Sequence, residues 1–117
     1  MKIIDVANII IPSVNQKYVL RAGRLVLSPS YRDFKSSLSK CCRRVSIAAP
    51  YSVTIEIESY KDIDNSIKPI LDCLTLAGVI IDDREVNELR VVKTKRKRGA
   101  SESLRVYVEQ KNLSESA

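Results

Sequence analysis

Alternation of apolar and polar residues predicts the strands of this chain. The clearest example is a segment in which Val53, Ile55 and Ile57 alternate with polar residues, a period of two that buries one face of a strand. Residues 18–27 are expected to form a hairpin or a loop, with Gly23 as a candidate turn residue. Residues 2–11 are apolar and β-branched, and we expect a strand there. Two more strands are expected at 86–92 and 104–108.

A first helix is indicated after the hairpin segment. Ser28 and Pro29 suit the N-cap and the first position of a helix. Apolar residues then recur at steps of three or four as far as Val45, which places them on one helical face. We expect this helix to end near residues 48–49, directly before a proline.

A second helical pattern runs over residues 67–77 and stops at Gly78, a residue type that commonly follows a helix end. Pro69 interrupts the pattern, because a proline inside a helix removes a backbone hydrogen bond and disfavours helical angles in the residue before it. The helix therefore either begins near Lys68 and Pro69 or has a distorted first turn.

The order of these elements predicts the fold class. A strand, a hairpin, a helix, a strand, a helix and two strands follow one another, and we expect a basic hairpin loop at 96–103 between the last two strands. This order favours an α+β fold of two layers, a mixed β-sheet with two helices packed on one face. The 117 residues suit one domain. We expect that domain to span residues 1–111, with a polar tail over 112–117.

Composition excludes several chemistries. The chain has no His, which removes Ser–His triads, histidine general bases and Cys/His zinc sites. Its three cysteines, Cys41, Cys42 and Cys73, are odd in number and lack C-x-x-C spacing, so we expect packing roles and a reducing cytoplasm. No apolar run approaches the roughly 18 residues of a membrane span, and no phosphate-binding glycine motif occurs. We therefore expect no membrane contact and no nucleotide cofactor.

Charge is distributed unevenly around a net value of +6. Residues 51–90 hold nine acids and four bases, whereas residues 93–98 hold five bases and no acid. The basic run could be a solvated loop or a localisation signal, but five bases at a loop tip are better explained as a phosphate-contacting arm. The bases of residues 32–44 are equally consistent with an exposed helix face and with a second phosphate contact. The predicted DNA-binding residues are Lys93, Lys95, Arg96, Lys97, Arg98, Arg43 and Arg44.

Carboxylates gather in the acidic middle of the chain. Asp62 and Asp64 are two residues apart at the end of a strand, so strand geometry would point both the same way. Asp82 and Asp83 follow the second helix, which could return them to the same place. So many carboxylates repel one another unless a cation is bound, and oxygen ligands suit Mg²⁺ or Mn²⁺. Such ions would activate a water for phosphodiester cleavage, and Lys68 would stabilise the transition state or position that water.

Each of these features also has a plainer structural interpretation. An Asp-x-Asp pair before a helix often caps that helix, and residues 82–83 could be no more than a polar turn. Asp72 lies four residues after Lys68, and we expect an ion pair between them. In a basic chain, the three acidic features together favour a site over three unrelated structural roles.

The segment from Asp62 to Asp83 carries a longer pattern. It reads D-I-D-N, then a lysine at 68, then L-D-C-L-T-L-A-G-V-I-I-D-D, and R-V-V-K follows at 90–93. This pattern resembles the RusA family of Holliday-junction resolvases. Weaker matches extend the resemblance to nearly the whole chain, namely Pro12-Ser13-Val14-Asn15, Tyr18 and Tyr31-Arg32.

The resemblance implies a small homodimeric endonuclease that depends on Mg²⁺ or Mn²⁺ and resolves four-way DNA junctions by paired symmetric nicks. By motif position, the family's catalytic and metal-binding aspartates fall on Asp62, Asp64 and Asp83, and its essential lysine on Lys68. Asp82, their neighbour, would support the ligands. The chain differs from many members in having no arginine cluster before the first aspartate.

We therefore hypothesise a metal-dependent, structure-selective DNA endonuclease that acts in recombination and repair. Its partners would be branched DNA and a second copy of the chain, because a junction must be cut on two strands of like polarity. We expect it in the cytoplasm, associated with the nucleoid when bound to DNA. Two alternatives stay open: a non-catalytic nucleic-acid-binding module, and a less selective nuclease acting on flaps or forks.

Overall fold

The computed structural model of the protein describes residues 1–12 and 17–111. The predicted tail at 112–117 and residues 13–15 of the motif near the N-terminus lie outside these ranges. The elements are, in chain order, β1 (Lys2–Ile9), β2 (Tyr18–Arg21), β3 (Arg24–Leu27), α1 (Pro29–Cys41), β4 (Tyr51–Ser59), α2 (Asp64–Leu76), the 3₁₀ turn η2 (Asp83–Glu85), β5 (Val86–Lys95) and β6 (Glu102–Gln110).

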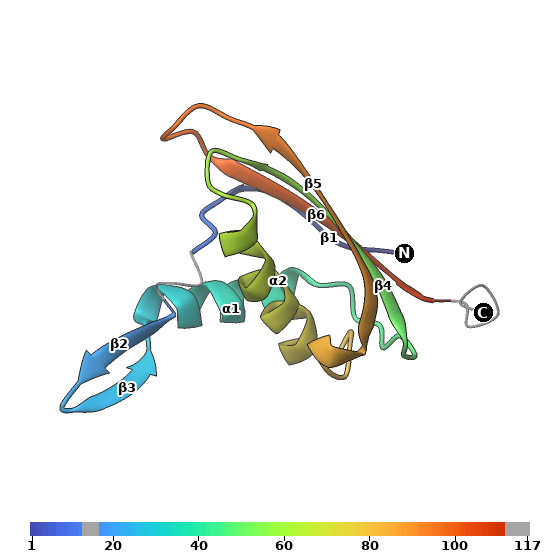
Figure 1. Ribbon diagram of the computed structural model, residues 1–117, viewed down its shortest axis with the longest axis horizontal. Coiled ribbons are helices and arrows are strands. Elements are labelled where there is room, and N and C mark those ends of the chain that lie inside the picture. The colour runs from blue at the N-terminus through green and yellow to red at the C-terminus, as the bar shows by residue number, and fades with distance from the viewer. Residues whose placement is uncertain (13–16, 112–117) are drawn as a thin grey trace.

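Four strands form one mixed sheet in the order β1-β6-β4-β5, and both long helices lie on the same side of it (Figure 1). Strand β4 pairs in parallel with β5 and antiparallel with β6, which in turn pairs antiparallel with β1. The predicted two-layer α+β fold is confirmed. Strands β2 and β3 form a separate hairpin that projects from the beginning of α1 (Figure 1).

The hydrophobic core lies between the central strand β4 and the helices. The alternation predicted for β4 is present, since Val53, Ile55 and Ile57 are at most 2% exposed. From α2, Ile70 and Leu74 are fully buried in the same cluster. Helix α2 thus packs against the face of β4. Because one short link joins them, the N-terminus of α2 lies near the carboxyl end of β4.

Helix α1 ends at Cys41, so the expected end near residues 48–49 is wrong. Cys42 takes extended backbone angles, and the N–H of Arg43 donates to the carbonyl of Ile3, 2.9 Å away. A β-branched residue, Val45, then packs against the core from an irregular segment. The apolar spacing continues beyond the helix, but the helix ends earlier because the N–H of Arg43 bonds to β1 instead of to the preceding helical turn.

Helix α2 begins at Asp64, so a start near Lys68 and Pro69 is wrong. The helix accommodates Pro69 in its second turn, where an interior proline costs about 3 kcal/mol through a lost hydrogen bond and a steric clash. Pro69 is buried, and this burial offsets part of that cost. Gly78 follows the helix with a φ of +76°, as predicted for the residue that ends it. Among the described helices, none is long and apolar enough to cross a membrane.

The loop between β5 and β6 is a crossover, so the expected basic hairpin is wrong. The two strands lie on opposite sides of β4 and do not pair with each other. The N–H of Arg96 donates to the carbonyl of Ser59 at 3.1 Å, and its guanidinium pairs with Glu58, which fixes the crossover to the end of β4. Helix α2 connects β4 to β5, which pairs in parallel along one edge of β4. Since that edge is occupied, β6 pairs with the other edge of β4.

Candidate active site

The link from β4 to α2 carries the first two candidate aspartates. Asp62 lies in the link and Asp64 is the first residue of α2, and both are exposed. The N-cap residue is Ile63, and α2 has no side-chain capping hydrogen bond. Within residues 1–12 and 17–111, neither carboxylate makes a hydrogen bond or an ion pair. The structure therefore does not support the interpretation of this Asp-x-Asp pair as a helix cap.

Lys68 lies one helical turn after Asp64, and residues four apart share a helix face. Its Nζ donates to Asp83 Oδ2 at 2.5 Å and lies 3.1 Å from Asp72 Oδ1. The predicted ion pair between Lys68 and Asp72 is confirmed. The hydrogen bond to Asp83 raises the pKa of Lys68, although partial burial opposes this effect. Lys68 is therefore a protonated group between two carboxylates.

Asp72 is itself held from a second helix. The hydroxyl of Tyr31, a fully buried residue of α1, donates to Asp72 Oδ2 at 2.6 Å, and Lys17 Nζ lies 3.2 Å from the same oxygen. Burial raises the pKa of Asp72, but hydrogen bonds from Tyr31, Lys68 and Lys17 outweigh it and lower that pKa overall. Asp72 is thus a fixed anion that restrains the ammonium of Lys68.

Removal of the Tyr31 hydroxyl tests this restraint. Tyr31→Phe is expected to lower the free energy of unfolding by about 1.5–3 kcal/mol, the usual contribution of a hydrogen bond to a charged group. Because the pKa of folded Asp72 is depressed, its stabilising contribution is present above the unfolded value near 3.9 and is lost as the pH falls through the folded value. Urea unfolding at pH 7 and pH 3 should show a smaller effect at pH 3. Tyr107→Phe is the control, and a difference below about 0.5 kcal/mol at pH 7 would contradict the account.

The neighbouring aspartates at the start of η2 differ in role. Asp82 accepts hydrogen bonds from the backbone N–H of Arg84 at 2.9 Å and from its guanidinium, and these bonds lower the pKa of Asp82 to about 2. Asp82 therefore caps a turn, as the plainer interpretation predicts. Asp83, one residue later, faces Lys68 instead. Only Asp83 of this pair stays a candidate for direct chemistry.

A divalent cation was predicted at these aspartates. Among residues 1–12 and 17–111, no three His, Cys, Asp or Glu side chains are arranged to hold one metal ion. The structure brings Asp83 to Lys68, and Asp62 and Asp64, at the beginning of α2, pair with none of the described residues. The donor chemistry nevertheless fits Mg²⁺ or Mn²⁺, because the candidates offer carboxylate oxygens and no cysteine lines the depressions beside them. The ligand set Asp62, Asp64 and Asp83 stays a prediction.

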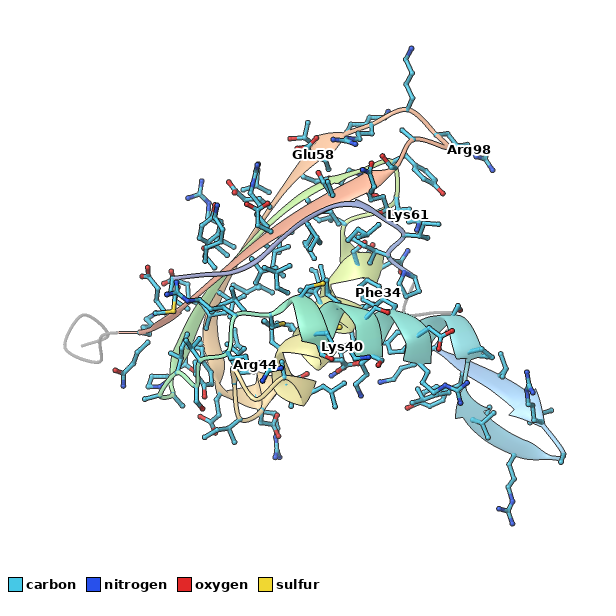
Figure 2. The ribbon with its side chains drawn as sticks, turned by 180° about the vertical axis from the view of Figure 1, so that it is seen from behind. Phe34, Lys40, Arg44, Glu58, Lys61 and Arg98 are labelled. Carbon is cyan, nitrogen blue, oxygen red and sulfur yellow. The ribbon has the colours of Figure 1, made fainter. Side chains whose placement is uncertain are left out.

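Two basic residues lie beside the candidate aspartates. Arg98, at the tip of the β5–β6 crossover, lines with Asp62 a depression of about 560 Å³ at the start of α2 (Figure 2). Lys35 of α1 lines a second depression together with Lys68 and Asp83. A phosphate bound by Arg98 would therefore lie next to Asp62.

The other predicted DNA-binding residues fall into three groups. Lys93 of β5 donates to the carbonyl of Lys61 at 2.5 Å and supports the link between β4 and α2, whereas the guanidinium of Arg96 supports the crossover. Lys95 and Lys97 are exposed along the crossover. Arg43 and Arg44 follow α1 and line a separate depression, well away from Arg98 (Figure 2). The structure thus separates residues bonded within the protein from two exposed groups, the crossover arm (Lys95, Lys97 and Arg98) and the patch after α1 (Arg43 and Arg44).

A buried carboxylate that the sequence analysis missed supports the strand end before Asp62. Glu102 is 2% exposed and accepts hydrogen bonds from Ser59 Oγ at 2.6 Å, Lys61 Nζ at 2.8 Å and the N–H of Ile11 at 3.1 Å. Lys61, the residue directly before Asp62, is therefore engaged inside the protein. This network fixes where the chain leaves β4 and enters the candidate site.

Exposed aspartates beside a fixed lysine, next to a basic arm, are typical of an enzyme that hydrolyses phosphodiesters. A model described as endodeoxyribonuclease RusA matches residues 56–109. Three proteins named crossover junction endodeoxyribonuclease RusA, from Escherichia coli (strain K12), Shigella sonnei (strain Ss046) and Enterobacteria phage 82, are each 30% identical to this chain over 90 residues. Each match covers 70% of this chain and 75% of the relative. The chain belongs to the RusA family of endodeoxyribonucleases.

Proposed function

We propose that this protein resolves Holliday junctions by paired, symmetric nicks and that it requires Mg²⁺ or Mn²⁺. One observation carries the proposal: Asp64 is exposed and makes no capping hydrogen bond in the described part of the chain, and it lies one turn before Lys68, whose ammonium is bonded to Asp83. The names of the relatives, crossover junction endodeoxyribonucleases, support the same substrate class.

In this proposal, Asp62, Asp64 and Asp83 would hold the divalent cation, which supplies a Lewis acid that activates water at neutral pH. Lys68 stabilises the negative charge that develops on the phosphate oxygens. Asp72 keeps Lys68 protonated and positioned, as described above. No histidine exists in the chain to serve as an alternative general base.

DNA binding is proposed for the crossover arm and the patch after α1. Arg98 would place the backbone beside Asp62, with Lys95 and Lys97 on the adjoining phosphates, and Arg43 and Arg44 would contact a second stretch of DNA. A homodimer with two-fold symmetry would present two such sites to two strands of like polarity. The protein would act in the cytoplasm, associated with the nucleoid while bound to DNA.

The salt dependence of binding tests the arm. Lys95→Gln/Lys97→Gln is expected to reduce the slope of log affinity against log salt by nearly 2, because each lost phosphate contact removes about 0.9. Lys2→Gln/Lys111→Gln removes the same charge from the opposite end of the sheet and is expected to leave the slope unchanged. A junction titration at several salt concentrations measures both. An arm variant with the wild-type slope would reject the phosphate role.

The proposed activity is tested with a synthetic four-way junction. We expect cleavage with Mg²⁺ or Mn²⁺, none with a chelator, and restoration when metal is added back. Linear duplex and flap substrates are expected to stay intact. Binding without cleavage would instead identify a non-catalytic module, and equal cleavage of duplex, flap and junction would identify a less selective nuclease.

A further inference from the structure

The β2–β3 hairpin carries one wholly apolar face that the rest of the described chain does not cover. Paired residues of a hairpin share a face, and the register pairs Tyr18 with Leu27 and Leu20 with Leu25 on this face. Leu20 and Leu25 are 71% and 72% exposed. A lone two-stranded hairpin is marginally stable in water. We therefore expect this apolar face to be covered by another surface.

The tip and the base of the hairpin have different surroundings. At the tip, Arg21 and Arg24 form the last pair, and neither makes an ion pair within residues 1–12 and 17–111. At the base, Lys17 accepts a backbone hydrogen bond from Ser28 at 2.8 Å and bonds through its side chain to Asp72. The hairpin is therefore fixed to the body at one end and offers an apolar face and two cations at the other.

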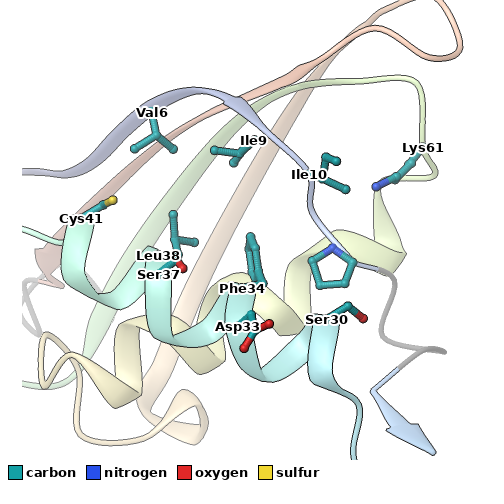
Figure 3. A pocket seen from close by; sticks show the side chains of 11 residues that line it. Val6, Ile9, Ile10, Ser30, Asp33, Phe34, Ser37, Leu38, Cys41 and Lys61 are labelled. Atoms are coloured by element: carbon teal, nitrogen blue, oxygen red, sulfur yellow. The ribbon is translucent and has the colours of Figure 1, made fainter.

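An apolar groove lies elsewhere on the same chain, between β1 and α1. Its volume is about 480 Å³, and Figure 3 shows side chains of β1 and the residues after it facing those of α1 across it. The principal apolar walls are Val6, Ile9, Ile10, Phe34 and Leu38. Ile10 is 79% exposed at the rim. The chain's own hairpin joins the beginning of α1, where Ser30 forms one end of the groove, and projects away from the groove (Figures 1 and 3).

Charge makes the two surfaces complementary. Two charged residues line the groove. Lys61 is paired with the buried carboxylate of Glu102, whereas Asp33 of α1 is exposed and makes no hydrogen bond or ion pair with the rest of the described chain. The hairpin tip brings two guanidiniums that pair with no described carboxylate. An apolar hairpin face with a basic tip thus matches an apolar groove with an acidic rim, and opposite charges across a contact favour one partner and one orientation.

We propose that the hairpin of one copy docks into the β1–α1 groove of a second copy, and that the exchange is reciprocal. Leu20 and Leu25 cover the apolar walls. Arg21 and Arg24 lie on the other face at the tip, and one of them reaches around the turn to pair with Asp33 of the second copy. Reciprocal docking gives a closed two-fold dimer in which each copy's hairpin face and each copy's β1–α1 groove are covered. The inference rests on the homodimer proposed above and identifies its contact.

The association is measured by sedimentation velocity over a range of protein concentrations, without DNA. Leu20→Ser/Leu25→Ser is expected to raise the dimer dissociation constant by about tenfold or more, because buried apolar anchors dominate such contacts. Leu76→Ser/Ile81→Ser is the matched control, since Leu76 and Ile81 are also exposed, at 55% and 74%. This control is expected to leave the dissociation constant unchanged.

Groove and charge variants test the other half of the contact. Ile10→Ser and Asp33→Arg should each weaken the dimer, and Arg21→Asp/Arg24→Asp should weaken it as well. Combining the reversed tip with Asp33→Arg should restore association. Because all these side chains are exposed, the variants do not depend on repacking of the core.

Several results would overturn the assignment. A monomeric wild-type protein, or a dimer unaffected by Leu20→Ser/Leu25→Ser, would reject the hairpin contact. A dimer weakened by the hairpin variant but not by Ile10→Ser or Asp33→Arg would reject the groove as its receptor. Hairpin variants that weaken junction binding while the dimer persists would assign the hairpin to DNA instead. A wild-type dimer with these sensitivities that cuts no junction would leave the contact standing and reject the nuclease.

Discussion

Asp64→Asn is expected to reduce the rate of junction cleavage by on the order of 10³-fold, the scale of losing one main electrostatic group of an active site. Asparagine is close to aspartate in size but carries no charge, so it weakens the attraction for a divalent cation. Asp64 caps nothing and pairs with no described residue, so the fold is expected to be unaffected. Junction binding is expected to be unchanged or tighter, because a negative charge near phosphate is removed.

Single-turnover cleavage and a binding titration separate the two effects of Asp64→Asn. Asp5→Asn serves as the control, since Asp5 is an exposed carboxylate on β1 whose one ion pair among the described residues is with Lys2 at 3.1 Å. It should cleave at the wild-type rate. If Asp64→Asn kept more than about a tenth of the wild-type rate, the assignment of Asp64 to metal binding would be wrong.

Lys68→Met is expected to lower the cleavage rate by about 10²–10³-fold, because the cation that faces the developing charge is lost. The change also leaves Asp72 and Asp83 without their shared ammonium. Lys68→Arg keeps a charge but has a larger, planar head group, and we expect an intermediate rate. Methionine keeps the length and much of the packing of lysine, so circular dichroism should show a folded protein.

Lys35→Met provides the matched control for Lys68. Lys35 lines the same depression but makes no ion pair with the described carboxylates. We expect its loss to weaken binding slightly and to leave the single-turnover rate within about threefold of wild type, as for a surface phosphate contact. Equal rates for Lys68→Met and Lys35→Met would show that Lys68 acts as one more surface charge.

Local patterns predicted the elements that local interactions determine. The alternation of Val53, Ile55 and Ile57 identified β4, and Gly78 identified the end of α2. The end of α1 could not be predicted from local patterns. It depends on the hydrogen bond from Arg43 to Ile3, which lies forty residues away in the sequence. The pairing of β5 was equally inaccessible, because a basic loop reads the same in a hairpin and in a crossover.

The candidate site shows the same division. A spacing of four residues was enough to predict the pair of Lys68 and Asp72, whereas the bond from Tyr31 to Asp72 spans 41 positions and has no local signal. Glu102 did have a signal, since it alternates in phase with Leu104 and the other buried residues of β6. A charged residue on the buried phase of a strand indicates a satisfied internal network.

The most direct test of the central claim is to map the cuts on a synthetic four-way junction, strand by strand, with Mg²⁺ or Mn²⁺ present. The account predicts cuts at symmetric positions in two opposing strands, made by the wild-type protein and absent with Asp64→Asn. An uncut junction, or unpaired cuts that also occur in linear duplex, would contradict it.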